Sequence, residues 1–91
     1  MNSSPVAVVE NASSSSITVR LETDVGESYA VGTIAPSTVT GVRVTGRDKL
    51  LWAVAEFPGG RIIQSKRLYT TTQGTLTVRI TDKAAELTYV L

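Results

Sequence analysis

The chain contains neither cysteine nor histidine among its 91 residues. Without cysteine it can form no disulfide bond, and it offers no thiolate nucleophile or thiolate ligand for zinc or an iron–sulfur cluster. Without histidine it lacks the usual general base near neutral pH and the commonest ligand of transition metals. Hydrolase sites that combine serine or cysteine with histidine are therefore excluded. We expect no enzyme activity, no catalytic residue, no metal site and no cofactor.

The chain also has no long apolar run, and its net charge is small. No apolar run approaches the roughly 18 residues that a transmembrane helix needs, so we expect no transmembrane segment. The net charge is only +1, and neither charge nor motif favours nucleic acid as a partner. The start, "MNSSPVAVV", lacks the basic and apolar regions of a signal peptide. The compartment stays open, although the abundance of Ser and Thr slightly favours the cell envelope or secretion over the cytoplasm.

The length and composition fit one folded unit. A hydrophobic fraction of 42% and a charged fraction of 19% are typical of a globular chain. Ninety-one residues provide one core and little room for a deep cavity beside it. We therefore expect a single domain, residues 1–91.

Two segments alternate strictly between apolar and polar residues, which is typical of strands with one buried face. In the first, Ile17, Val19 and Leu21 are the apolar members, and in the second they are Leu76, Val78 and Ile80. Less regular strand-like segments span residues 6–10, 28–34, 38–44, 50–57, 62–68 and 87–91. Only residues 81–87 carry helix formers, enough for one turn at most.

Turn-forming residues separate these segments. Gly, Pro, Asn, Asp and Ser concentrate at residues 11–16, 23–28, 35–38, 45–49, 58–60 and 70–75. Short strands at this spacing indicate an all-β fold. We predict an antiparallel β-sandwich of seven to eight short strands, with a small β-barrel as the alternative.

The passage "LLWAVAEFPGGRIIQSKRL", residues 50–68, holds the only Trp and the only Phe. Its first strand is apolar on both faces, which indicates a central strand covered on both sides or a face kept for a partner. The Pro58-Gly59-Gly60 break then supplies glycines that can adopt the positive φ of tight turns. We expect a central hairpin with its turn at residues 58–60.

The order of features resembles small bacterial immunoglobulin-like or transthyretin-like β-sandwich domains of the cell envelope. The pieces that carry the resemblance are "VAVVENASSSSITVRL", "YAVGTIAPST", "LLWAVAEFPGG" and "GTLTVRI". The resemblance spans nearly the whole chain but contains no specific motif. It implies a non-catalytic module that supports, spaces or binds, and it transfers no functional residue. The buried disulfide of antibody-type domains is impossible here without cysteine.

Six cations cluster in the middle of the sequence, where only Asp48 and Glu56 oppose them. They are Arg43, Arg47, Lys49, Arg61, Lys66 and Arg67. Brought together by the fold, they would form a site for an anionic ligand or partner, such as a phosphate, an acidic glycan or an acidic protein face. Alternatively, they are solvated charges that discourage edge-to-edge association of strands.

Two other groups of residues have both a functional and a structural interpretation. Trp52 and the three tyrosines could stack on sugar rings, although Trp52 is also the natural core filler. Glu22, Asp24 and Glu27 could ligate calcium, but the ligand spacing of an EF-hand is absent, and a turn with surface acids explains them equally.

The strand-like segments at the two ends, 6–10 and 87–91, favour a role in association. Terminal strands often lie at sheet edges, whose unpaired backbone groups can accept a partner strand. We therefore predict a structural or protein-interaction module that can self-associate through edge strands. A glycan- or anion-binding module, which would use exposed aromatics or the basic 43–67 segment, is the alternative.

Overall fold

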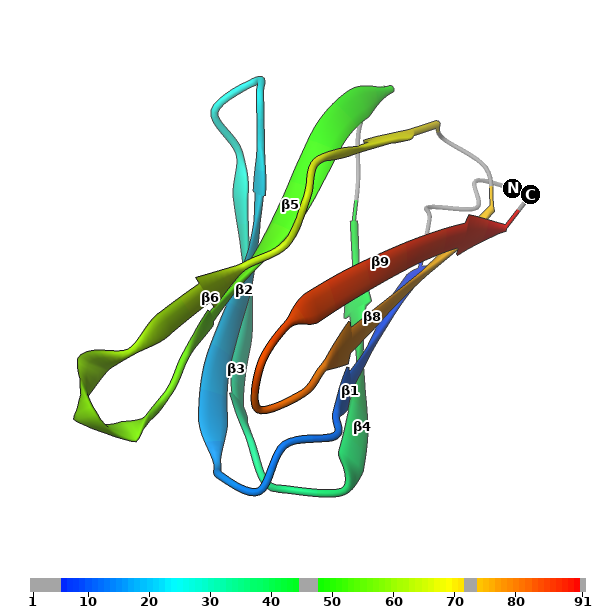
Figure 1. The fold of residues 1–91 in the computed structure, drawn as a ribbon. Coiled ribbons are helices and arrows are strands. Elements are labelled where there is room, and N and C mark those ends of the chain that lie inside the picture. The colour runs from blue at the N-terminus through cyan, green and yellow to red at the C-terminus, as the bar shows by residue number, and fades with distance from the viewer. Residues whose placement is uncertain (1–5, 45–47, 72–73, 91) are drawn as a thin grey trace.

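The computed structural model describes residues 6–44, 48–71 and 74–90, and strands dominate these residues (Figure 1). The strands are β1 (Val6–Asn11), β2 (Ile17–Thr23), β3 (Ser28–Ile34), β4 (Thr38–Arg43), β5 (Lys49–Glu56), β6 (Ile62–Gln64), β7 (Leu68–Thr70), β8 (Thr75–Ile80) and β9 (Ala85–Val90). One short 3-10 turn, Pro58–Gly60, is the only helical element in the described part of the chain.

The strands form two sheets that pack face to face. The β1 sheet has the order β4-β1-β8-β9. The β5 sheet has the order β3-β2-β5, and β6 and β7 both pair with the remaining side of β5. Across the described residues neither sheet closes into a barrel, so the prediction of an all-β sandwich is confirmed and the barrel alternative is not.

The described chain has nine strands because the predicted strand 62–68 is broken in two. Ser65 donates its N–H to the carbonyl oxygen of Ala53 at 2.9 Å. Its hydroxyl oxygen accepts the N–H of Ala53 at 2.8 Å, a place that a backbone carbonyl would fill in a continuous ladder. The Ser65 side chain thus replaces a backbone carbonyl as the partner of Ala53. As a result β6 ends at Gln64, and pairing with β5 begins again only at Leu68, the start of β7.

One strand pair departs from the predicted antiparallel arrangement. β1 is antiparallel to β4 but parallel to β8. The turn after β1 carries the chain into the other sheet, so β1 does not pair with β2. Instead, β1 lies between two strands that run in opposite directions, and one of its two neighbours must therefore be parallel to it.

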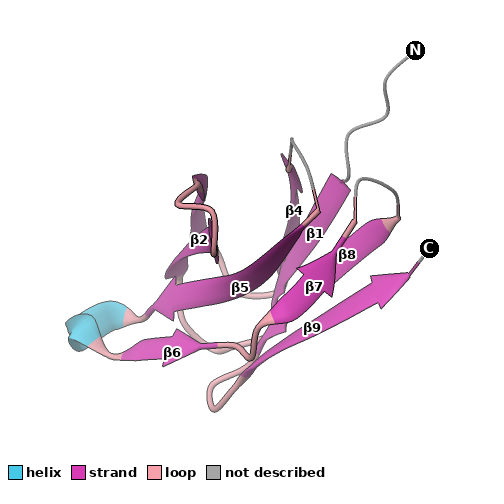
Figure 2. Cartoon of the chain, turned by 90° about the horizontal axis from the view of Figure 1, so that it is seen from above, coloured by secondary structure: helices cyan, strands magenta, loops and turns pink. Residues whose placement is uncertain are grey.

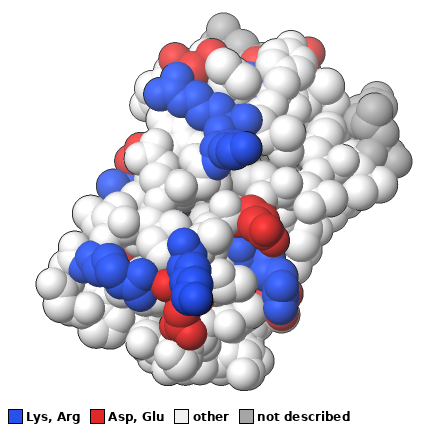
Figure 3. Space-filling model, viewed as in Figure 1, with Lys and Arg blue, Asp and Glu red and all other residues white. Residues whose placement is uncertain are grey.

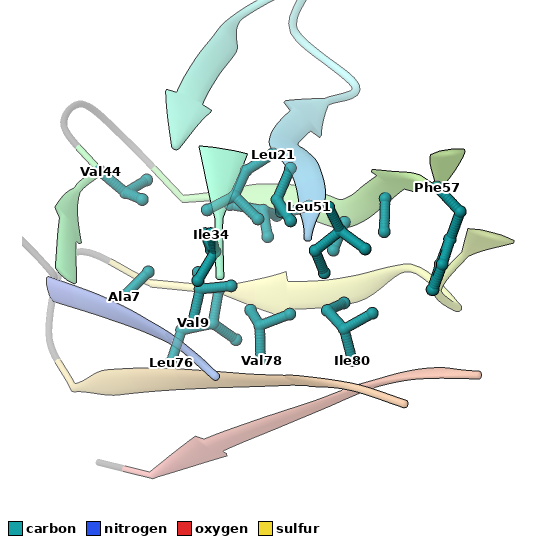
Figure 4. Close-up of a cluster of buried hydrophobic side chains, with 14 residues drawn as sticks. Ala7, Val9, Leu21, Ile34, Val44, Leu51, Phe57, Leu76, Val78 and Ile80 are labelled. Atoms are coloured by element: carbon teal, nitrogen blue, oxygen red, sulfur yellow. The ribbon is translucent and has the colours of Figure 1, made fainter. Parts of the chain in front are cut away.

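The core lies between the two sheets, and the two strictly alternating segments contribute to it as predicted. β2 and β8 bury every second residue. Figure 4 shows the buried side chains of both sheets meeting in one layer. The cluster consists of Ala7, Val9, Ile17, Val19, Leu21, Ile34, Val44, Leu51, Ala53, Ala55, Phe57, Leu76, Val78 and Ile80.

Strand β5 is buried on both faces, as its composition indicates. Leu51, Ala53 and Ala55 point into the core and are fully buried. On the opposite face Trp52 and Val54 are also buried, with only 9% and 3% of their surface exposed. The side chains that contact Trp52 on this second face include Glu22 of β2 and Arg67, which lies between β6 and β7.

Two tight turns complete the β5–β6 and β8–β9 hairpins. The predicted turn at residues 58–60 is confirmed, with φ angles of 87° at Gly59 and 90° at Gly60, and it lies at the far end of the hairpin in Figure 2. Residues 81–84 form no helical turn. The Thr81 hydroxyl oxygen accepts the N–H groups of Lys83 and Ala84, and β9 begins at Ala85, before the predicted start.

Candidate functional site

The structure separates the cations of the basic 43–67 segment. Lys and Arg side chains form several groups on the face in Figure 3, with acidic side chains among them. Arg43 is exposed on β4, Lys49 starts β5, and Arg61 follows the 3-10 turn. Arg47 lies outside the described residues. Lys66 and Arg67 occupy the break between β6 and β7, where both are exposed.

Lys49 is an internal cation, with 3% of its surface exposed. Its ammonium group forms an ion pair with the carboxylate of Glu27 and donates a hydrogen bond to the Tyr29 hydroxyl at 3.0 Å. Burial lowers the pKa of Lys49, but these two hydrogen bonds outweigh burial and leave the pKa above its usual value. The charge is thus compensated by Glu27, whose side chain is partly exposed, and the pair links β5 to the β2–β3 hairpin.

Arg61 belongs to a polar connection between three turns. Its guanidinium stacks on the Phe57 ring at 4.3 Å and donates a hydrogen bond to the Asp82 carbonyl oxygen at 2.8 Å. The Asp82 carboxylate accepts hydrogen bonds from the N–H and the hydroxyl of Ser14. These bonds, with a smaller contribution from the charge of Arg61, lower the pKa of Asp82. The arrangement ties the β8–β9 turn to both sheets.

Arg67 covers the outward-facing tryptophan of β5. Its guanidinium lies 4.4 Å from the centre of the Trp52 ring, within the range of a cation–π contact. The indole N–H donates to Glu22 at 3.2 Å, and Glu22 forms an ion pair with Arg20 at 2.7 Å. The hydrogen bond from Arg20 is the largest cause that lowers the pKa of Glu22. Arg67 is therefore positioned by stacking, although the residue as a whole is exposed.

The three acids considered as calcium ligands each bond to different protein groups. Glu22 is bound to Arg20 and Trp52, and Glu27 to Lys49. Asp24 accepts the backbone N–H of Leu50 at 3.1 Å. Among the described residues no three acidic side chains gather into a group that could hold a metal ion.

The aromatic side chains do not form a common platform in the described structure. Trp52 is buried beneath Arg67. Tyr29 and Tyr89 are half-buried, and their hydroxyls bond to Glu27 and Thr71 respectively. Tyr69 alone is largely exposed, at 57%, and its hydroxyl donates to Asp48. A planar stack for sugar rings would need at least two coplanar exposed rings, which these positions do not supply.

Strand β9 presents an open backbone edge. Within the turn that precedes it, the N–H of Thr81 bonds to the carbonyl of Ala84 at 2.8 Å, and the β8–β9 register continues without a shift. Because successive residues of an antiparallel ladder point alternately toward and away from their partner strand, Ala85, Leu87 and Tyr89 direct their N–H and C=O groups away from β8. We refer to these outward backbone groups as the β9 edge.

The other sheet edges are interrupted or covered. β3 contains a bulge, where its register with β2 shifts between Val19 and Arg20, and bulges hinder the addition of a further strand. The edge formed by β6 and β7 is broken at residues 65–67. β4 lies against β3 on the same side of the sandwich. β9 is continuous over six residues and carries one charge, Glu86.

A groove runs beside the β9 edge. Its volume is about 680 Å³, which lies in the usual range of ligand sites. One wall is the break between β6 and β7, and the other is the first half of β9. The lining consists of Lys66, Arg67, Leu68, Ala84, Ala85, Glu86, Leu87 and Thr88. The groove thus joins two members of the basic segment to an open strand edge.

The sequence analysis expected strands at both ends of the chain to lie at sheet edges. This is correct for β9 but wrong for β1, which lies between β4 and β8 because the turn after it carries the chain into the other sheet. The groove itself was missed. The signal for the open edge is in "AELTYV", which has alternating strand residues, no Pro and one charge. No comparable signal places Lys66 and Arg67 opposite β9, because the two segments are far apart in sequence and meet only through the packing of the two sheets.

The described residues include no helix of the length and apolar character required to cross a membrane. Comparisons with known proteins give no relative: no protein-family model, no curated protein and no solved structure matches the chain.

Proposed function

We propose that this chain is a non-catalytic protein-interaction module that binds its partner by strand addition at the β9 edge. The observation that supports the proposal most directly is the row of outward backbone groups at Ala85, Leu87 and Tyr89, on a continuous strand at the margin of the β1 sheet. Unpaired N–H and C=O groups in such a row provide most of the affinity for an added strand.

A non-catalytic role agrees with the inventory of side chains. The chain has no Cys or His to act as a nucleophile or general base near neutral pH. Of its acids, Glu22 and Asp82 are bound to Arg20 and Ser14. These contacts lower the pKa of both carboxyl groups and so oppose the raised pKa that a general acid needs.

We also propose that the relationship suggested by the sequence lies with the transthyretin-like group of envelope domains. In the constant-type immunoglobulin sandwich the first and second strands share a sheet. Here β1 and β2 lie in opposite sheets, so the strand order differs from that type. An extracytoplasmic location is part of the same proposal.

The first experiment measures strand addition at the backbone. Amide hydrogen exchange by NMR, run over a range of protein concentrations, reports the N–H groups of Ala85, Leu87 and Tyr89 individually. A second copy that pairs through β9 would slow the exchange of these amides as concentration rises, in step with dimer formation in analytical ultracentrifugation. In parallel, selection from a library of random extended peptides tests for a partner of different sequence, with protection of the same amides as the readout.

Two proline variants provide the matched comparison. Leu87→Pro removes an outward N–H at the centre of the β9 edge, and Ala85→Pro removes one at its end with little loss of side-chain packing. Both should abolish or weaken protection and association by at least about tenfold, while circular dichroism shows a folded chain. The proposal fails if the protein stays monomeric and selects no peptide that protects β9, or if association persists unchanged in both folded variants.

The glycan- or anion-binding alternative retains one supporting observation. Trp52 is covered, so an aromatic platform has no support from the geometry. Lys66 and Arg67 do remain exposed side by side, but they line the groove next to the β9 edge. Their charge is therefore best considered together with strand addition.

A further inference from the structure

The groove beside the β9 edge has unequal charge on its two walls. Lys66 and Arg67 stand on the wall formed by the β6–β7 break, and Glu86 is the one acid among the described residues of the lining. Among the described residues, neither Lys66 nor Arg67 has a carboxylate within ion-pair distance. The two cations thus provide uncompensated positive charge at a place where an added strand would pass.

Arg67 is also held in position before any partner binds. Its guanidinium is stacked on Trp52, and the indole is fixed in turn by its hydrogen bond to Glu22. A side chain that is already ordered loses less rotamer entropy when a ligand binds it. The planar guanidinium matches a carboxylate, to which it can donate two parallel hydrogen bonds.

From this arrangement we infer that the groove binds an extended peptide segment of another protein, with acidic side chains facing Lys66 and Arg67. The inference rests on the proposed strand addition at the β9 edge and names the chemical class of the partner. Main-chain bonds to β9 supply affinity, and the two cations select for acidic side chains.

The geometry of an added strand supports this assignment. A strand paired with β9 lies about 4.8 Å from it, and its side chains alternate between the two faces of the sheet. Those on the groove side face the wall formed by Lys66, Arg67 and Leu68. Leu68 is half-buried and packs against the core, so the same wall accommodates an apolar side chain beside the acidic ones.

A second copy of the chain fits this wall less well. Its own β9 carries a single acid, Glu86, and five uncharged residues. Nucleic acid or a sulfated glycan would match the positive charge. However, such polymers have no strand backbone to pair with β9, and the described residues that line the groove include no aromatic ring for stacking bases. The combination of an open strand edge with two cations favours an acidic peptide.

The test uses three fluorescent peptides of about ten residues that share one alternating strand-forming sequence. They differ only at the groove-facing positions, which carry Glu, Thr or Lys. Fluorescence anisotropy with the full chain should give tightest binding for the Glu peptide, by about tenfold over the Thr peptide, as expected for two exposed charge pairs. The Lys peptide should bind more weakly than the Thr peptide. The preference should shrink at high salt because exposed charges are screened.

Matched charge variants locate the preference. Lys66→Glu should remove most of the advantage of the Glu peptide, and Arg67→Gln should reduce it. Arg43→Glu makes the same change in net charge on exposed β4, at the opposite margin of the β1 sheet, and should leave the preference intact. Neither Lys66→Glu nor Arg43→Glu touches the core, so both variants are expected to fold.

The outcomes separate this inference from the proposed function. Equal binding of the three peptides, with protection of the β9 amides, overturns the acidic preference and leaves strand addition standing. No binding of any peptide, without self-association, overturns both. If heparin or an oligonucleotide binds as tightly as the Glu peptide and Ala85→Pro has no effect on either, the site recognises polyanions, and the peptide assignment is wrong.

Discussion

The two margins of the sandwich, one at β3 and β4 and the other at β9 and the β6–β7 break, are built differently. At the first margin β3 and β4 follow each other in the chain and lie against each other, and β3 is bulged. At the second margin the chain leaves a groove of about 680 Å³ between residues 66–68 and the first half of β9. One margin is sealed by local connectivity, whereas the other is left with backbone groups and charges exposed.

The comparison shows how the same sandwich can have one margin that is closed by its own chain and another that is able to bind a partner. Buried polar groups hold the turn between β1 and β2 against the end of β3, from which the chain runs on to β4. The side-chain amide of Asn11 donates to the carbonyl oxygens of Ser15 and Ile34, both at 2.8 Å. Its oxygen accepts the N–H and hydroxyl of Ser13. At the second margin the backbone groups of the β9 edge point away from β8 and have no backbone hydrogen bond within the described part of the chain, which is the condition for accepting a partner.

The largest loss of stability is expected when the buried hydrogen bonds of Asn11 are removed. Asn11→Ala leaves the carbonyl oxygen of Ile34 and the N–H of Ser13 without their partners in a buried site, which should lower the free energy of unfolding by about 2–4 kcal/mol. Thr88→Ala, on the exposed face of β9, should change it by less than about 0.5 kcal/mol. Urea denaturation followed by Trp52 fluorescence measures both. Equal effects would remove the distinction between the margins.

The second effect concerns the direction of backbone groups on β9. Glu86→Pro removes an N–H that points toward Arg79 of β8 and should cost about 2–3 kcal/mol of stability. Ala85→Pro removes an outward N–H and should cost below about 1 kcal/mol, since proline is tolerated at strand edges. Thermal unfolding by circular dichroism compares these neighbouring positions. A reversed order would show that the outward direction is assigned to the wrong residues.

A smaller effect is expected where Arg67 covers Trp52. Arg67→Ala removes the cation–π contact and exposes the indole, with a loss of about 1 kcal/mol and a red shift of tryptophan emission. Lys66→Ala makes an equal change in charge at the next residue and should leave the emission unchanged. An unshifted spectrum in Arg67→Ala would mean that Arg67 does not shield the ring.

The smallest effect is a pH dependence at the turn that leads into β9. Hydrogen bonds from Ser14 lower the folded-state pKa of Asp82 below its ordinary value of 3.8. The stabilisation is therefore complete above the unfolded-state pKa, and it is lost as the pH falls through the lower folded-state pKa. Asp82→Asn should show a shallower loss of stability below about pH 4 than the parent. Identical acid unfolding curves would contradict the assignment.

The sequence predicted the sandwich because its signals are local. Alternation in β2 and β8, and the Pro58-Gly59-Gly60 turn, act within a few residues. The break at Ser65 was missed because a serine within a strand-like run carries no sign that its hydroxyl will replace a backbone carbonyl. The parallel pairing of β1 with β8 was missed because it depends on which sheet each strand joins.

The basic segment shows the same limit for the candidate site. Six cations close together in sequence suggested one site for an anionic ligand. However, successive residues of a strand face opposite sides and successive strands can join different sheets, so neighbours in sequence are separated in space. Lys49 is buried and pairs with Glu27, and Arg61 bonds to Asp82, whereas Lys66 and Arg67 face β9. The sequence supplies the six cations, but only the fold places two of them, Lys66 and Arg67, at the groove.

By itself, the sequence determined that this protein is built from β-strands and that it lacks the Cys and His side chains on which much catalysis depends. It also marked the C-terminal strand as one suited to a sheet edge. Only the tertiary structure decided that β9 borders a groove and that Lys66 and Arg67 stand opposite it. The physical reason is range: periodicity and turn chemistry act over a few residues, whereas the groove lies between residues 66–68 and 84–88, which only the packing of the two sheets brings together.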